Sequence, residues 1–138
     1  MRKILPVALA LALMGAGCDN SAGGDPSPPT TVTLTPETFT GTVDPGGSDS
    51  HGFTIAQAGE VDVTLTAAGP PATILMGLGV GTPSGSTCQL LTGGSVTTRA
   101  GTTPQLVGSA NAGSYCVAVY DVGNQAAQVT YSVTVAHP

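Results

Sequence analysis

The feature that most constrains the fold is a two-residue alternation of apolar and polar side chains. In the segments 60–66, 115–120 and 129–135, valine, leucine or tyrosine alternates with hydroxyl, acidic or small residues. Successive side chains of a strand point to opposite faces, so this alternation predicts strands with one buried and one solvated face. We expect the buried members to share one core: Val61, Val63, Leu65, Tyr115, Val117, Val119, Tyr131 and Val133.

Turn-forming residues separate these segments at short intervals. Clusters of Gly, Pro, Asn and Asp predict turns at 44–47, 69–71, 83–85, 93–94 and 122–124. Further strands are expected at 31–35, 39–43, 52–56, 73–80, 87–91 and 105–109. No segment has the caps and the 3.6-residue period of a useful helix. Many short strands with closely spaced turns are typical of a β-sandwich or a barrel, so the fold class is all-β.

The first 17 residues have the composition of a secretory signal. Two cations at positions 2 and 3 precede an apolar run over 4–14, and three small residues lead into Cys18. The run is about half of the roughly 20 apolar residues that a membrane-spanning helix needs. Residues 1–17 are therefore predicted to be a signal peptide.

The motif Gly15-Ala16-Gly17-Cys18 resembles the bacterial lipobox. This resemblance implies that Cys18 is acylated on its sulfur, becomes the mature N-terminus and anchors the protein in a membrane of the cell envelope. Two or three acyl chains anchor a protein stably, whereas one binds only marginally. The alternative is an ordinary secretory signal with Cys18 unmodified. Whether the anchor would lie in the inner membrane, the outer membrane or the cell surface stays open.

The segment 18–30 is small, polar and rich in Pro and Gly, without hydrophobic periodicity. This composition predicts a disordered tether between the lipid and a single β-sandwich domain over 31–138. Beyond the signal peptide the chain has one cation, Arg99, and eight carboxylates. Nucleic-acid binding needs a basic footprint, so the charge balance excludes it. The remaining partner classes are the membrane, reached through the lipid, and an envelope protein or glycan.

With Cys18 assigned to the lipid, Cys88 and Cys116 remain as an even pair in an oxidising compartment. We predict a disulfide between them. A redox or metal pair is disfavoured because the two cysteines are far apart in sequence and neither has a histidine nearby.

Two stretches carry a family resemblance. GTVDPGGSDSHGFTIAQAGEVDVTL at 41–65 and GSYCVAVYDVGNQAAQVTYSVTV at 113–135 resemble the bacterial pre-peptidase C-terminal domain. The resemblance covers roughly residues 37–135 and implies a jelly-roll-like antiparallel sandwich of about eight strands. Members of that family are usually non-catalytic accessory modules of secreted proteases and other hydrolases. The resemblance therefore implies an interaction or structural role.

The densest polar cluster is DPGGSDSH at 44–51. Its carboxylates make Asp44 and Asp49 candidate calcium ligands, because Ca²⁺ takes six to eight hard oxygens. The loop lacks the spacing of an EF-hand, so distant carboxylates such as Asp121 would have to converge on it. We therefore expect no cofactor, and a calcium-dependent carbohydrate- or protein-binding module is the alternative function.

A hydrolase is a further alternative, in which His51 would join a serine and an aspartate. A catalytic triad needs side chains that converge from different elements, whereas these residues are adjacent in sequence. We expect a non-catalytic protein without catalytic residues. The glycines at 77, 79 and 81 are expected to bend or flatten a strand, and Tyr120 is the one aromatic ring expected on an outer face.

Overall fold

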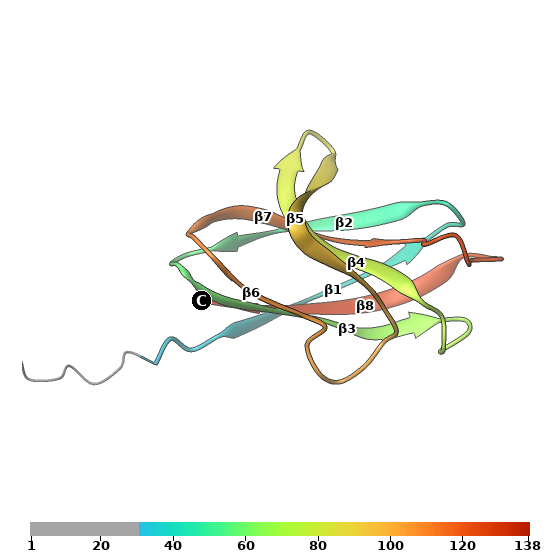
Figure 1. The fold of residues 1–138 in the computed structure, drawn as a ribbon, viewed down its shortest axis with the longest axis horizontal. Helices are drawn as coiled ribbons and strands as arrows, with labels where there is room; N and C mark the ends of the chain where they lie inside the picture. Colours follow the sequence, from blue (N-terminus) through green and yellow to red (C-terminus); the bar gives the residue numbers. More distant parts are fainter. Residues whose placement is uncertain (1–30) are drawn as a thin grey trace, which may run out of the picture. The chain divides into compact units, whose positions relative to one another are not determined.

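The computed structural model describes residues 31–138, which form eight strands and no helix (Figure 1). No helix in this part of the chain is long and apolar enough to cross a membrane. The predictions for 1–17, for 18–30 and for Cys18 lie outside the described residues. The strands are β1 Thr35–Val43, β2 Ser48–Ile55, β3 Gly59–Gly69, β4 Met76–Ser84, β5 Thr87–Thr98, β6 Leu106–Ala110, β7 Gly113–Tyr120 and β8 Val129–His137.

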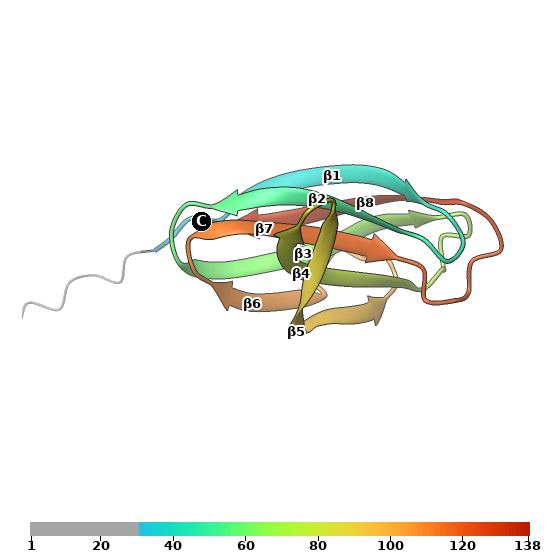
Figure 2. The same ribbon diagram turned by 90° about the horizontal axis from the view of Figure 1, so that it is seen from above.

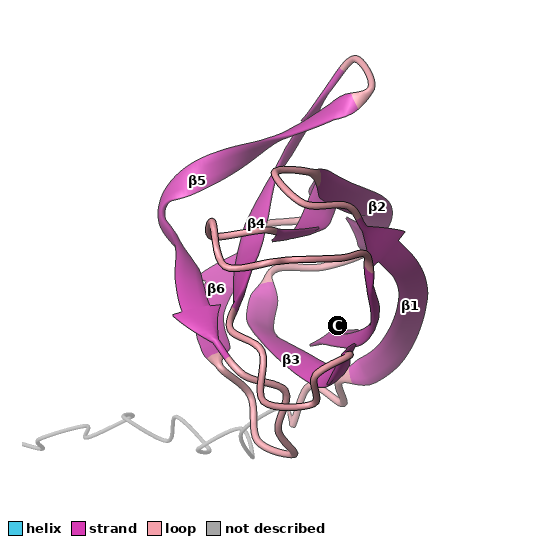
Figure 3. Ribbon diagram, turned by 90° about the vertical axis from the view of Figure 1, so that its right-hand side faces the viewer, coloured by secondary structure: helices cyan, strands magenta, loops and turns pink. Residues whose placement is uncertain are grey.

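The strands form two four-stranded antiparallel sheets with the orders β1-β8-β3-β6 and β2-β7-β4-β5. Each strand of the first half pairs with one of the second half: β1 with β8, β2 with β7, β3 with β6 and β4 with β5. This pairing is that of a jelly roll, in which a long double ribbon wraps into two facing sheets. Figure 3 shows the two sheets around the shared interior. The predicted all-β, eight-stranded antiparallel sandwich is confirmed.

The interior is lined by the apolar residues that the alternation selected. Seven of the eight predicted core residues are buried, and Tyr115 is partly buried and packs against them. The most buried side chains are contributed by both sheets, among them Leu65, Leu78, Val117 and Val133 at 0% exposure. Burying a side chain of this size stabilises the fold by about 1.5–3 kcal/mol. The core therefore holds the two sheets together.

Several sequence predictions about local structure are wrong, including two strand lengths: β2 begins at Ser48 and not at 52, and β5 runs on to Thr98 and not to 91. The strand expected at 31–35 begins only at Thr35, whose partner His137 is followed by Pro138, which has no N–H to continue the ladder. The strand expected at 73–80 begins at Met76, because Ile74 instead closes a turn onto the Pro71 carbonyl.

A further error concerns the glycine pair at 93–94, which was expected to reverse the chain. It instead lies inside β5 as a bulge, since Gly79 pairs with Ser95 and Gly81 with Leu90. Residues 91–94 therefore oppose Val80 alone. Gly93 takes a φ of +74°, which a glycine adopts at little cost.

Candidate functional site

The polar segment 44–51 begins with a tight turn between β1 and β2, but it is not the continuous loop that the sequence predicted, because residues 48–51 already belong to β2. The Gly47 N–H donates to the Asp44 carbonyl at 2.8 Å, and Gly46 takes a φ of +72°. Proline at the second position and a positive φ at the third are the marks of a type II turn. The turn predicted at 44–47 is therefore confirmed.

Asp121, at the end of β7, holds this turn from the other end of the chain. One carboxylate oxygen, Oδ2, accepts the Gly46 N–H at 2.7 Å. The other, Oδ1, accepts the backbone N–H groups of residues 123, 124 and 125. The Gly46 bond, with help from the other three, lowers the pKa of the Asp121 carboxyl below its ordinary value of 3.8. Sequence reasoning named Asp121 only as a distant carboxylate, because nothing local indicates its contact with the turn.

Asp49 and His51 meet Tyr131 where β1 and β2 lie side by side (Figures 2 and 3). The Tyr131 hydroxyl donates to Asp49 Oδ2 at 2.7 Å, and His51 Nε2 lies 2.8 Å from the same hydroxyl oxygen. Because the Tyr131 hydroxyl has one proton and uses it in the hydrogen bond to Asp49, His51 Nε2 is the donor in the hydrogen bond between His51 and Tyr131. The His51 ring also stacks on Phe39 at 5.1 Å between centroids.

Gly41 makes room for this cluster. A Cβ at this position would lie 2.7 Å from the Tyr131 hydroxyl and would also collide with the Asp49 carboxylate. Tyr131 is only 4% exposed. Burial, followed by the hydrogen bond to Asp49 and its negative charge, raises the pKa of the Tyr131 hydroxyl above its ordinary value of 10.0. A tyrosine held in its neutral form is suited to bridging the sheets and not to acting as a base.

This arrangement gives the hydrolase alternative no support. His51 meets a tyrosine and a carboxylate from its own strand, and no serine hydroxyl within residues 31–138 hydrogen-bonds to it. Ser50 contributes only its backbone N–H, which donates to Asp49 Oδ1 at 2.9 Å. A triad needs a nucleophile in contact with the base.

The two calcium candidates have separate protein partners. Asp44 Oδ1 accepts from the Gln128 side-chain amide at 2.8 Å, whereas both Asp49 oxygens accept protein donors. Asp121 does converge on the turn after Asp44, but its oxygens accept backbone N–H groups there. Within the described part of the chain, no group of three or more His, Cys, Asp or Glu residues is arranged to hold a metal ion.

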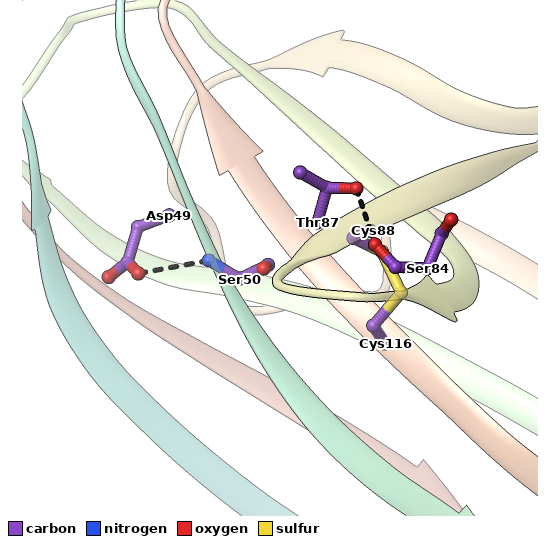
Figure 4. The surroundings of a disulfide bond; sticks show 6 residues. All are labelled: Asp49, Ser50, Ser84, Thr87, Cys88 and Cys116. Atoms are coloured by element: carbon purple, nitrogen blue, oxygen red, sulfur yellow. Dashed lines mark hydrogen bonds between the residues drawn. A yellow bond between two sulfur atoms is a disulfide. The ribbon is translucent and has the colours of Figure 1, made fainter.

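A disulfide joins the β4–β5 hairpin to β7 near the polar segment 44–51. Cys88 and Cys116 are bonded with their Cα atoms 5.8 Å apart, as predicted. Val117 and Val119 of β7 point into the core. Cys116 alternates with them along the strand and therefore lies on the outer face of β7. Figure 4 shows the β4–β5 hairpin crossing over β7 at this bond, close to Ser50 of β2. The bond closes a chain separation of 28 residues and stabilises the fold by about 3–4 kcal/mol in the chain-entropy model.

Three glycines on the outer face of β4 allow close approach of neighbouring groups. A Cβ at Gly79 would collide with Leu90 and one at Gly81 with the backbone of Gln89, both on β5, whereas one at Gly77 would collide with the Tyr120 ring of β7. The sequence predicted a bend or flattening at these positions, and the structure shows close approach of the β5 arm of the hairpin at two of them and of Tyr120 at the third. The signal is the spacing of the glycines by two, which places all three on one face.

A polar groove of about 530 Å³ lies between the β1–β2 turn, the end of β7 and the hairpin tip. Its lining is dominated by hydroxyls, glycines and two carboxylates, and Tyr120 is the one aromatic residue in it. The residues are Gly46, Gly47, Ser48, Asp49, Ser50, Ser86, Thr87, Cys88, Leu90, Ala118, Tyr120 and Asp121. The groove joins the predicted loop to Tyr120. Sequence reasoning did not find the wall formed by 86–90, because its place depends on the pairing of β5 with β4 and on the disulfide to β7.

A scan of the chain against protein-family models found no match, and a search of curated proteins also found none.

We expect Asp121→Asn to lower the melting temperature in a pH-dependent manner. Since the folded-state pKa of Asp121 is depressed, its stabilising contribution is present above about pH 4 and is lost as the pH falls through the folded value. Thermal melts of wild type and variant should therefore differ most near neutral pH and converge in acid. Asp44→Asn is the control, since its amide oxygen can still accept from Gln128. A difference that did not change with pH would contradict the assigned role of the charge.

We expect Tyr131→Phe to destabilise the fold by about 1–3 kcal/mol, because it leaves the Asp49 carboxylate and the His51 N–H without their buried partner. Urea unfolding would measure this loss. Tyr120→Phe is the matched control, since the Tyr120 hydroxyl has no hydrogen bond to any residue of 31–138. Equal stability of the Tyr131→Phe variant and wild type would show that the cluster is not structural.

Proposed function

We propose that this chain is a non-catalytic, lipid-anchored protein of the bacterial cell envelope whose β-sandwich binds a partner. The observation that carries the binding role is the polar groove, because three segments far apart in sequence build it and a disulfide holds one wall in place. The side-chain hydroxyls of its lining suit hydrogen bonds with a protein surface or a glycan. The resemblance to the pre-peptidase C-terminal domain agrees with an accessory, non-catalytic module.

The charge of the groove lining limits the classes of partner that it can bind. Its two carboxylates already accept N–H and O–H donors, whereas the side-chain hydroxyls of Ser48, Ser50 and Ser86 have no hydrogen bond to residues of 31–138. No lysine or arginine lines the groove. Neutral hydrogen-bonding groups are therefore the chemistry that it offers, which favours a glycan or a neutral protein surface over an anion.

The anchor rests on the N-terminal sequence. Acylated Cys18 would hold the domain at the membrane through the polar segment 19–30, and a disulfide in the domain suits an oxidising extracytoplasmic compartment.

The anchor is tested by the full chain carrying Cys18→Ser. Wild type should incorporate radiolabelled palmitate and fractionate with membranes, whereas the variant should incorporate none and be released or retained as unprocessed precursor. Cys88→Ser together with Cys116→Ser is the control for general loss of a thiol. Palmitate labelling of the Cys18→Ser variant would contradict the lipid assignment.

The groove is tested by Ser50→Arg in the lipidated chain, captured with cross-linked partners or glycan fragments from native envelopes. A long cation in the groove should remove the specific partner, while Ser132→Arg on the outer face of the opposite sheet should leave it bound. Loss of the partner in both variants, or in neither, would contradict binding at the groove. Loss of capture by wild type in EDTA would favour the calcium-dependent alternative.

A further inference from the structure

The edge of the sandwich opposite the β1–β2 edge contains an apolar cavity of about 240 Å³. It lies between β5 of one sheet and β6 of the other, which run next to each other in Figures 2 and 3. Its walls are mainly aliphatic and aromatic, and no charged residue lines it. The lining includes Phe53, Ile55, Val61, Val63, Leu106 and Tyr115.

Two local departures from a regular sandwich create this cavity. The first is Gly108, which lies at an inward-facing position of β6 between Leu106 and Ala110, opposite Val61 of β3. A Cβ built on Gly108 would meet no atom within 4 Å, and Gly108 is exposed, so the missing side chain leaves the cavity open to solvent at this point. A regular inward-facing valine or leucine at this position would fill part of the interior.

The second departure is the bulge in β5. Residues 91–94 oppose Val80 alone and line the cavity through Leu91, Thr92, Gly93 and Gly94. Leu91 is 43% exposed, which is unusual for a large apolar side chain beside a core and places it at the opening of the cavity. Bulges at sheet edges commonly serve to redirect side chains at binding sites.

The size and lining of the cavity define what it can hold. An apolar cavity of about 150 Å³ stays dry and binds benzene, so 240 Å³ has room for a fused ring or a medium-length alkyl chain. The lining offers no partner for a charge, and burial of an unpaired charge is costly. The hydroxyls of Thr92, Ser109 and Tyr115 are the polar side chains among the lining residues.

We propose that this cavity, which we call the β5–β6 pocket, binds small uncharged hydrophobic molecules. It is separate from the polar groove, and its occupancy does not depend on the lipid anchor or on the proposed envelope partner. The driving force is removal of apolar ligand surface from water into a preformed apolar site.

The test is a titration of the full chain with indole, as a ring, and separately with 1-octanol, as an alkyl chain, followed by methyl-resolved NMR. With at least one probe, we expect saturable shifts at the methyls of Val63 and Leu106 and none at Val43, which is buried but outside the pocket. Which probe binds distinguishes a ring from a chain. The absence of saturable shifts with both probes would overturn the proposal.

Gly108→Leu is the decisive variant, because its side chain would occupy the open space. We expect a native spectrum, a melting temperature that is not lowered, and affinity for the probe reduced by about tenfold or more. Leu91→Ser, at the exposed opening, should also weaken binding and gives a second reading if Gly108→Leu does not fold. Val122→Ser is the matched control, being 38% exposed and outside the pocket, and should change affinity by less than about twofold. Unchanged affinity in folded Gly108→Leu or in Leu91→Ser would overturn the assignment.

Discussion

Packing of the two sheets against each other is the constraint on which the rest of the molecule depends. The side chains that meet between the sheets are almost entirely valine, leucine, isoleucine and aromatic residues. Hydrophobic burial is not directional. The register of strand pairing therefore decides which side chains face the core, and glycines decide where neighbouring segments can pack closely. The groove and the β5–β6 pocket form where this packing stops, at the margins of the two sheets.

The two edges end the core in opposite ways. At the β1–β2 edge, Phe39, His51 and Tyr131 fill the space between the sheets, and Asp49 accepts a hydrogen bond from the Tyr131 hydroxyl. Farther along the same edge, the buried His137 ring packs against Phe53, and its Nε2 lies 3.1 Å from Glu37 Oε1. At the β5–β6 edge, a glycine and a bulge leave the interior open. Polar residues can close an edge because their outer atoms reach water while their rings pack on the core.

The sequence predicted the parts of this structure that depend on local patterns. The alternation placed the core residues of β3, β7 and β8, and the turn chemistry placed the turn at 44–47. It did not predict the Asp121 contact with Gly46 or the Tyr131 contact with Asp49, which join residues 75 and 82 positions apart. Such contacts depend on strand order and register, for which a single segment carries no signal. The glycine pair at 93–94 was misread for a related reason: glycines are favoured both in turns and in β-bulges, so their presence alone does not distinguish the two.

By itself, the sequence determined that the domain is all-β and which face of most strands is buried, and it predicted that Cys88 pairs with Cys116. These properties follow from side-chain period and composition, which are local. Only the tertiary structure decided that the disulfide hairpin forms a wall of the polar groove and that Gly108 opens a pocket. The physical reason is that a groove or cavity is the space between segments, so its shape depends on how distant strands pair and pack.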